Sequence, residues 1–329
     1  AAALDRAYPG GTTGVTYGDP AAGTARRADV IPGVEHISIL FSERTLTDTV
    51  SWLETAYERT GTPGEPGFDT RVLWLVVLTV GAAVGFVPLA RLAFGDRPRE
   101  ERLDEPSASA PVLPLGWALG IGAGSAVVAS LAGWALPDVA DLLPVAVGGY
   151  VWLWFGTAGV VAGVVAWVVG TRLAHAAAGR IGAEVRQSGA PSRSVVRPIL
   201  ATLAMTAYAV AVLALAGQHT WTAFALVGDR TWLVPVMEVA LIAYFWADER
   251  LAARPSRSRR LLVVVVNRTV AVVAILGSVV LLGAPGFLTL LLPLMALLFV
   301  LLGSYAFVVS GLTHERWAPA VVQGVPLAY

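Results

Sequence analysis

The sequence predicts a helical protein that crosses a membrane about seven times, after a short water-soluble segment at its N-terminus. Hydrophobic residues make up 56% of the 329 residues and charged residues only 14%, whereas soluble domains carry roughly 25% charged residues. The apolar residues gather in seven long runs, and every second loop between the runs is rich in arginine. Such a chain needs lipid as its solvent for most of its length.

Each of the seven runs is long enough to cross a bilayer, which takes roughly 17 to 25 mainly apolar residues. They follow a Gly- and Pro-rich linker at residues 60–71 and lie at 72–94, 115–136, 142–170, 196–217, 231–247, 261–283 and 287–311. Buried helices of a large soluble core would need charged surface helices elsewhere, and the sequence has none. The membrane domain is therefore expected at 72–311, and residues 312–329 form a cytoplasmic tail or begin a further span.

The arginine distribution predicts how the chain is oriented. Basic loops at 91–113, 171–197 and 248–260 alternate with loops that carry at most one arginine. Short loops rich in Arg stay on the cytoplasmic side. We therefore expect a multi-pass plasma-membrane protein with these loops in the cytoplasm and the N-terminal segment outside the cell.

Composition excludes several kinds of chemistry. The formal net charge is zero, so nothing attracts the chain as a whole to nucleic acid. There is no cysteine, which excludes disulfides, thiolate metal sites and cysteine nucleophiles. Three of the four histidines (His175, His219 and His314) fall in loops on opposite sides and form no metal cluster. We expect no cofactor and no metal, and the lipid bilayer as the main partner.

Glycines in the second and third spans predict closely packed helices. They lie at positions 120, 122, 124, 148, 149, 156, 159 and 163. Small residues let helix backbones approach closely inside a membrane, and this explains the pattern without any ligand chemistry.

The N-terminal segment, residues 1–59, has a recognisable order of elements. A helix at residues 1–8 is followed by turns and a short strand at 26–31. A Pro-Gly turn then leads to His36. Thr45 is the expected N-cap of a closing helix, whose apolar face carries Leu46, Val50, Leu53 and Tyr57.

This order resembles the C-terminal end of an α/β-hydrolase. The residues that carry the resemblance are Val30-Ile31-Pro32-Gly33-Val34-Glu35-His36, the spacer 37–42 and the helix ending Val50-Ser51-Trp52-Leu53. In that family the last strand leads to the loop that holds the triad histidine. The resemblance implies a small α/β remnant of a hydrolase domain over residues 1–59, with His36 as the catalytic histidine of a serine ester or acyl hydrolase.

The rest of that triad has no match in this sequence. The family order is nucleophile, acid, histidine, and no Gly-x-Ser-x-Gly precedes His36. The chain starts without Met and ends inside a new apolar run, so we interpret it as a piece of a longer protein whose upstream part holds the nucleophile and acid. Asp5, Asp19 and Asp29 are weak candidates for the acid. An ordinary polar loop histidine is the alternative interpretation of His36.

Two spans carry polar residues deep in apolar sequence. Glu238 lies in the fifth run, and Asn267 and Arg268 lie in the sixth. An unpaired charge in mid-bilayer costs at least about 2.5–3.5 kcal/mol. Glu238 lies about 15 Å of helix rise before Asp248, and Arg268 about 12 Å after Arg260. The matching depths predict a Glu238–Arg268 ion pair, assisted by Asn267, which either fixes helix register or forms part of a transport or proton-relay site.

Two hypotheses about function are consistent with these patterns. The first is the C-terminal part of a membrane-tethered, extracytoplasmic α/β-hydrolase-like protein acting on a lipidic or cell-envelope ester. The second is a non-enzymatic integral membrane protein, either a transporter or a scaffold, with a degenerate hydrolase-like outer domain. A Gly-x-Ser-x-Gly motif and an Asp on a strand-end loop upstream of Ala1 would favour the first.

Overall fold

The computed structural model describes residues 2–34, 39, 42–57, 70–95, 112–145, 147–178, 195–220, 231–253, 256–313 and 315–328. The chain divides into two compact units, Ala1–Leu75 and Val76–Tyr329. Across the described ranges every regular element is a helix, and no β-strand is formed.

The described residues of the first unit form α1 (Ala2–Ala7), α2 (Glu43–Ala56) and the first turn of a longer helix that continues into the second unit. The closing helix begins earlier than predicted, because Ser42 and not Thr45 is its N-cap. The Ser42 hydroxyl accepts a hydrogen bond from the backbone N–H of Thr45 at 3.3 Å. None of the residues of α2 is buried, and on its predicted apolar face Leu46 and Val50 are half-buried while Leu53 and Tyr57 are exposed.

The predicted strand at 26–31 is wrong. Tyr17 and Arg26 form one isolated antiparallel bridge instead, with backbone N–H to O distances of 2.9 and 2.7 Å. A strand needs neighbours along several residues, and a lone pair of strands is marginal even with a full ladder. The expected α/β remnant is therefore not seen, and His36 lies outside the described residues.

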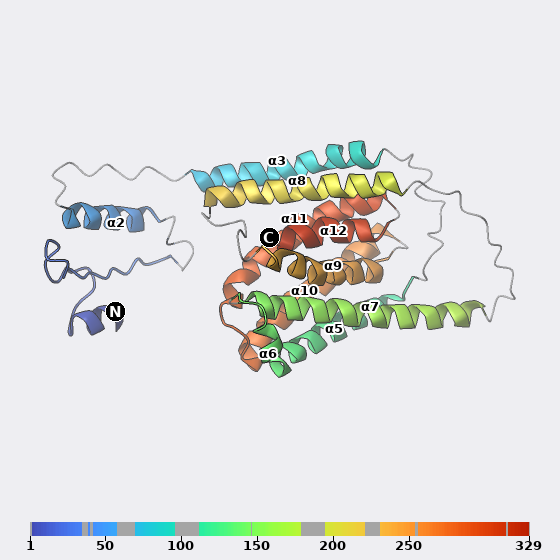
Figure 1. Ribbon diagram of the computed structural model, residues 1–329, viewed down its shortest axis with the longest axis horizontal. Helices are drawn as coiled ribbons and strands as arrows, with labels where there is room; N and C mark the ends of the chain where they lie inside the picture. The colour runs from blue at the N-terminus through green and yellow to red at the C-terminus, as the bar shows by residue number, and fades with distance from the viewer. Residues whose placement is uncertain are drawn as a thin grey trace. The chain divides into compact units, whose positions relative to one another are not determined.

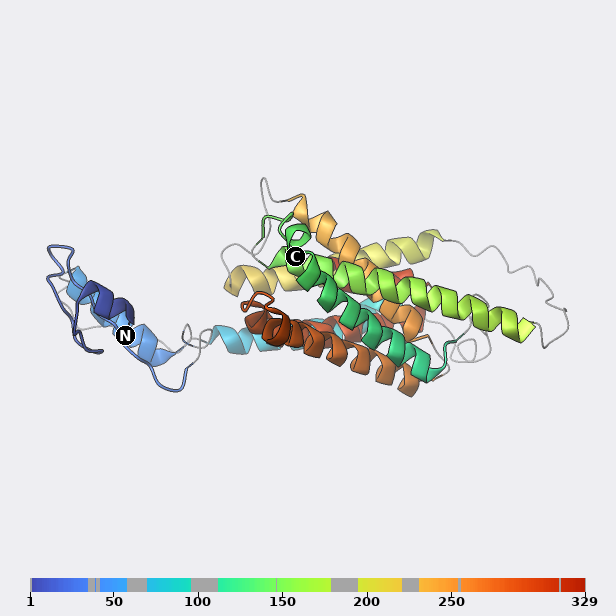
Figure 2. The same ribbon diagram turned by 90° about the horizontal axis from the view of Figure 1, so that it is seen from below.

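The second unit is a helical bundle (Figures 1 and 2). Its long helices are α3 (Arg71–Phe94), α5 (Leu115–Ala135), α7 (Gly148–Ala178), α8 (Val196–Thr220), α9 (Leu233–Leu251), α10 (Arg257–Leu282) and α11 (Leu288–Leu312). The described residues also form two short helices, α6 (Pro137–Ala140) and α12 (Trp317–Ala328). Among the described residues, six helices are long and apolar enough to cross a bilayer, and α9 is the long helix that does not qualify. The predicted multi-pass helical membrane protein is thus confirmed.

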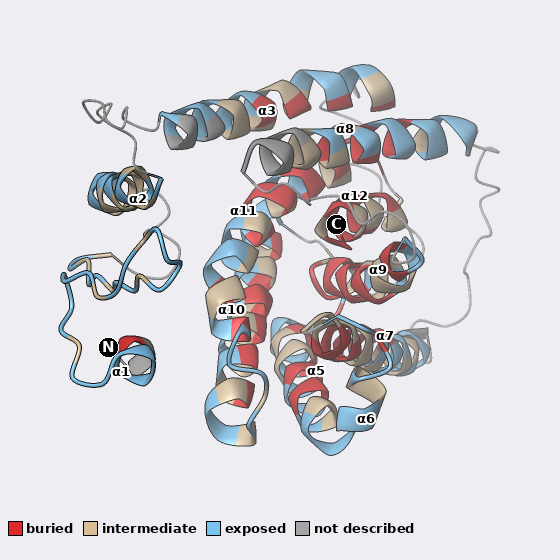
Figure 3. Ribbon diagram, turned by 60° about the vertical axis from the view of Figure 1, so that its left-hand side comes forward, coloured by how far each residue is buried: buried red, intermediate tan, exposed pale blue. Residues whose placement is uncertain are grey.

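Two helices, α9 and α12, lie in the middle of the bundle (Figure 3). The central α9 packs mainly on α7 and α12, while α12 also contacts α8 and α11. Ten of the 19 residues of α9 are buried, and eight of the 12 of α12. Residues 312–329 were predicted to be either a cytoplasmic tail or the beginning of a further span, and the structure has a short buried helix there, α12.

Close backbone contacts hold α9 in place. A Cβ atom on Gly159 of α7 would collide with the backbone of Ala243 and Tyr244, and one on Gly324 of α12 would collide with Ile242. Small-residue packing is therefore present where α7 crosses α9. Gly120 and Gly124 of α5, in contrast, face open space.

Candidate functional site

Four charged side chains meet inside the bundle, near the turn that joins α9 to α10. Asp248 and Glu249 are consecutive residues near the end of α9, and Arg260 and Arg268 lie on α10. All four are between 4% and 6% exposed. Charged groups at this depth are stable only when they are paired and hydrogen-bonded, and the structure supplies both.

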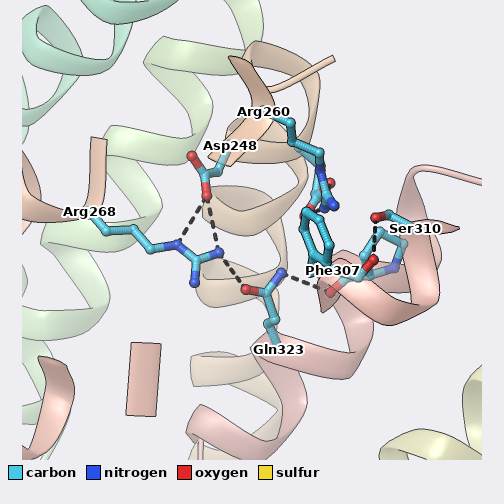
Figure 4. A network of polar contacts seen from close by, with 8 residues as sticks. Asp248, Arg260, Arg268, Phe307, Ser310 and Gln323 are labelled. Carbon is cyan, nitrogen blue, oxygen red and sulfur yellow. Dashed lines mark hydrogen bonds and ion pairs between the residues drawn. The ribbon is translucent and has the colours of Figure 1, made fainter. Parts of the chain in front are cut away.

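The first ion pair joins Arg268 to Asp248. The Arg268 Nη2 and Nε atoms lie 3.2 and 3.3 Å from the same carboxylate oxygen, Oδ2. Nη1 donates to the carbonyl oxygen of Phe299 on α11 at 2.8 Å. Nη2 also donates to the Oε1 atom of Gln323, a fully buried residue of α12 (Figure 4). One guanidinium thus links four helices.

Aromatic rings and a backbone contact complete the surroundings of Arg268. Its guanidinium carbon lies 5.4 Å from the ring centre of Phe245 and 5.6 Å from that of Phe299, distances at which a ring face attracts a cation. Gln323 is itself held by a hydrogen bond from its Nε2 atom to the carbonyl of Pro319 at 3.0 Å. Gly303 of α11 leaves room for the guanidinium, since a Cβ there would collide with Nη1.

The second ion pair joins Arg260 to Glu249. The Arg260 Nη2 atom lies 2.9 and 2.8 Å from the two carboxylate oxygens. Its guanidinium carbon also lies 5.2 Å from the ring centre of Phe307. Two carboxylates and two guanidiniums make the whole cluster formally neutral, which is the arrangement that a low-dielectric interior tolerates best.

The predicted partner of Arg268 is wrong. Glu238 is half-buried on α9, and among the described residues no ion pair involves it. Side chains lean toward the N-terminus of their own helix. Arg268 therefore reaches back to the end of the bundle where α10 begins and α9 finishes, and Asp248 lies there. The prediction used only the helix rise between each charged residue and the loop. It therefore ignored this lean and placed Asp248 at the membrane surface.

Asn267 lies beside Asp248 and lines the same cavity. It is 6% exposed, and neither its Oδ1 nor its Nδ2 atom has a partner in the part of the chain that the structure describes. The second carboxylate oxygen of Asp248, Oδ1, also has none. Asp248 and Asn267 both line a cavity of about 20 Å³, together with Gly122 and Ser125 of α5 and Trp154 of α7.

A second, larger hollow lies at another place in the bundle. It has a volume of about 250 Å³ and is bounded by the end of α5, by α6, by the start of α7 and by the α10–α11 turn. Trp134, Asp141 and Tyr150 line it, and the first two are exposed. It shares no lining residue with the charged cluster.

The described residues contain no group of three or more His, Asp or Glu side chains that is able to hold a metal ion. His175 is exposed on α7. His36 and His314 lie outside the described residues, so the structure does not test the role predicted for His36.

Sequence reasoning missed Asp248, Glu249 and Gln323 as members of the site. Asp248 and Glu249 were taken for loop residues because they follow the apolar run. The sequence does contain a signal for the two acids. Asp248, Glu249 and several arginines flank one short loop, and this pattern could have predicted a neutral cluster of charges at that turn. Gln323 offered no such signal, because α12 is too short to be recognised as a span.

Comparison with known proteins adds no relative: no family model matches the sequence, and no curated protein or solved structure matches it significantly. The chemistry of the site therefore follows from its own residues. Every charge in the cluster is already paired, which suits a structural role better than proton transfer or ion binding.

Proposed function

We propose that this chain is the membrane domain of an extracytoplasmic α/β-hydrolase-like protein, and that its bundle is a rigid platform that holds the hydrolase part at the membrane surface. In this proposal α9 is the seventh span, enclosed by the other helices. The hydrolase part is a serine ester or acyl hydrolase with His36 as its catalytic histidine, and a lipidic or cell-envelope ester is the substrate class that suits its location.

The pairing of the buried charges is the observation that supports a platform. Transport of an ion or a proton needs groups that exchange partners or a water path between them. In this bundle Arg260 is paired with Glu249 and Arg268 with Asp248. The Arg268 guanidinium also donates hydrogen bonds to α11 and α12. The cavity beside Asp248 has room for about one water molecule. Within the described residues these features support a structural role, because the charged groups are held by their partners and the cavity takes about one water molecule.

The hydrolase assignment is supported by the sequence pattern that ends at His36. A histidine on a loop after a strand-like segment can take the proton of a serine nucleophile and return it to the leaving group. The nucleophile and the acid are expected upstream of Ala1, and the upstream remainder of the hydrolase domain is then the partner of residues 1–59.

The test of the enzyme is hydrolysis of a p-nitrophenyl ester by the full protein, including the upstream part, in nanodiscs. His36→Ala should lower turnover by about three orders of magnitude or more, because triad members act as a unit. His175→Ala is the matched control and should retain the turnover of the parent, since His175 is exposed on α7. Near-parental turnover of His36→Ala would remove this residue from the mechanism.

The orientation is tested with single cysteines, since the chain has none of its own. Ser256→Cys lies in the turn between α9 and α10, and Ala284→Cys lies in the turn between α10 and α11. In intact cells an impermeant maleimide should label position 284 and spare position 256, because the Arg-rich loop is expected in the cytoplasm. The opposite labelling pattern would reverse the topology.

Ion- or proton-coupled transport is a second candidate, and Glu238 favours it. This residue is a half-buried acid on α9 that has no ion pair among the described residues. The test is proton or sodium flux in proteoliposomes loaded with a pH- or sodium-sensitive dye. A flux that Glu238→Gln abolishes would favour the transporter, whereas the platform predicts leak equal to that of empty vesicles.

A further inference from the structure

Three buried polar atoms point to a site that the ion pairs leave unexplained. They are Oδ1 of Asp248 and both Oδ1 and Nδ2 of Asn267, and none of them has a hydrogen-bond partner among the described residues. Their residues are 4% and 6% exposed. A buried polar atom without a partner costs about 1–3 kcal/mol, so such atoms normally bind either another protein group or an ordered water molecule.

These residues line one cavity. Its volume is about 20 Å³, and its walls come from α5, α7, α9 and α10. One water molecule needs at least roughly 10–15 Å³ of such space and two to four polar partners. The cavity admits one water molecule and excludes any organic ligand.

The polar atoms around the cavity can both accept hydrogen bonds from a water molecule and donate one to it. The two Oδ1 atoms accept hydrogen bonds, and Nδ2 of Asn267 donates one. Ser125 also lines the cavity; its hydroxyl donates to the carbonyl of Gly122 at 2.9 Å, so its oxygen still accepts. A water molecule has two hydrogens to donate and two lone pairs that accept.

The charge of the neighbourhood selects a neutral ligand over a cation. Asp248 is already paired with Arg268 at 3.2 Å, and Glu249 is paired with Arg260 at 2.8 Å. An added sodium ion would place an uncompensated positive charge beside a guanidinium in a low-dielectric interior. A water molecule adds no charge.

The sequence of α5 keeps the cavity open. A Cβ atom on Gly122 would collide with the Asn267 side chain, and the neighbouring wall is made of small residues, Ala126 of α5 and Ala158 and Ala162 of α7. Gly122 therefore permits Asn267 to lie beside Asp248. Larger residues on this wall would fill the space.

From these features we propose that the cavity binds one structural water molecule, which hydrogen-bonds to Asp248 and Asn267 and joins α5 to the α9–α10 ion pairs. The water molecule would donate a hydrogen bond to Oδ1 of Asp248, the carboxylate oxygen that Arg268 does not bind. This inference concerns the bundle alone and holds whether or not the hydrolase assignment is correct.

The direct test is an experimental structure of the full chain in nanodiscs at a resolution of about 2 Å or better. One isolated density peak within about 2.6–3.2 Å of both Asp248 and Asn267 is the expected result. A direct hydrogen bond between Asn267 and Asp248, with no peak between them, would overturn the proposal.

Two measurements in solution complete the test. Replacing choline chloride by sodium chloride at constant ionic strength should leave the thermal unfolding temperature unchanged; a sodium-dependent increase would make the site a cation site and overturn the proposal.

Gly122→Ala should lower the folding equilibrium constant about tenfold or more, because Asn267 is pushed into the space of the water. Gly120→Ala, whose Cβ meets nothing, is the matched control and should change it less than about threefold; equal effects of the two variants would also count against the site.

Discussion

Two helices of the bundle, α3 and α9, show opposite relations between sequence and burial. The span in α3 meets every criterion of length and apolarity, yet only 17% of it is buried. Its Val80, Val84 and Leu92 are 57%, 68% and 77% exposed. In contrast, α9 carries Glu238, Asp248, Glu249 and Arg250 and fails those criteria, yet more than half of it is buried. In lipid, the helix with the weaker membrane signal occupies the centre.

The physical reason lies in what holds helices together in a bilayer. Lipid tails are as apolar as leucine, so apolar surface gains nothing by turning inward. Helix α3 contacts its neighbours through side chains, such as the Tyr208 hydroxyl that donates to the Ala82 carbonyl at 2.9 Å and the stacked Phe86 and Tyr305 rings. Helix α9 is held by backbone approach and by ion pairs. Polar contacts and small residues therefore decide which helix lies inside.

The largest expected effect comes from breaking the Arg268 cluster. Arg268→Met should lower the free energy of unfolding by about 3–5 kcal/mol, because Asp248 is left buried without a counter-charge. Arg257→Met, on the exposed first turn of the same helix, should change it by about 0.5 kcal/mol or less. Unfolding by SDS titration in mixed micelles measures both, and similar losses would mean that burial does not distinguish the two arginines.

A smaller effect is expected where α7 crosses α9. Gly159→Ala should lower the free energy of unfolding by about 1–3 kcal/mol, because the new Cβ pushes the α9 backbone away. Gly156→Ala, one turn earlier, meets the Ala240 side chain at an ordinary 3.5 Å and should be close to neutral. The same titration compares them, and a neutral Gly159→Ala would show that backbone approach does not hold α9.

Most of the bundle could be predicted from the sequence, because long apolar runs have few alternatives to membrane helices. The start of α7 was placed too early, at residue 142, since Pro144 and the following turn delay the helix to Gly148. Its end was placed too early as well, because no helix breaker follows Gly170 and the helix continues to Ala178. Element boundaries thus depended on breakers and caps, which the apolar pattern does not contain.

The candidate site could be predicted only in part. The cost of a charge in lipid indicated that Arg268 must have a partner, and it has one. The identity of that partner depends on how α9 and α10 are rotated and on which helices lie beside them, and neither follows from depth along the chain. The buried α12 adds Gln323 to the site from an apolar run of only 12 residues, too short to be recognised as a span. The prediction of an N-terminal strand was wrong because a strand needs hydrogen-bonded neighbouring strands, and a local sequence pattern does not show whether they are present.

A double-mutant cycle on Arg268 tests the central claim, that Asp248 on the buried α9 is the partner of this arginine. The four proteins are the parent, Arg268→Met, Asp248→Asn and the double variant, and SDS titration gives the free energy of unfolding of each. The account predicts a coupling energy of about 2 kcal/mol or more for this pair, and additivity within about 0.5 kcal/mol in the parallel cycle with Glu238→Gln. Additivity for Asp248 together with strong coupling for Glu238 would contradict it.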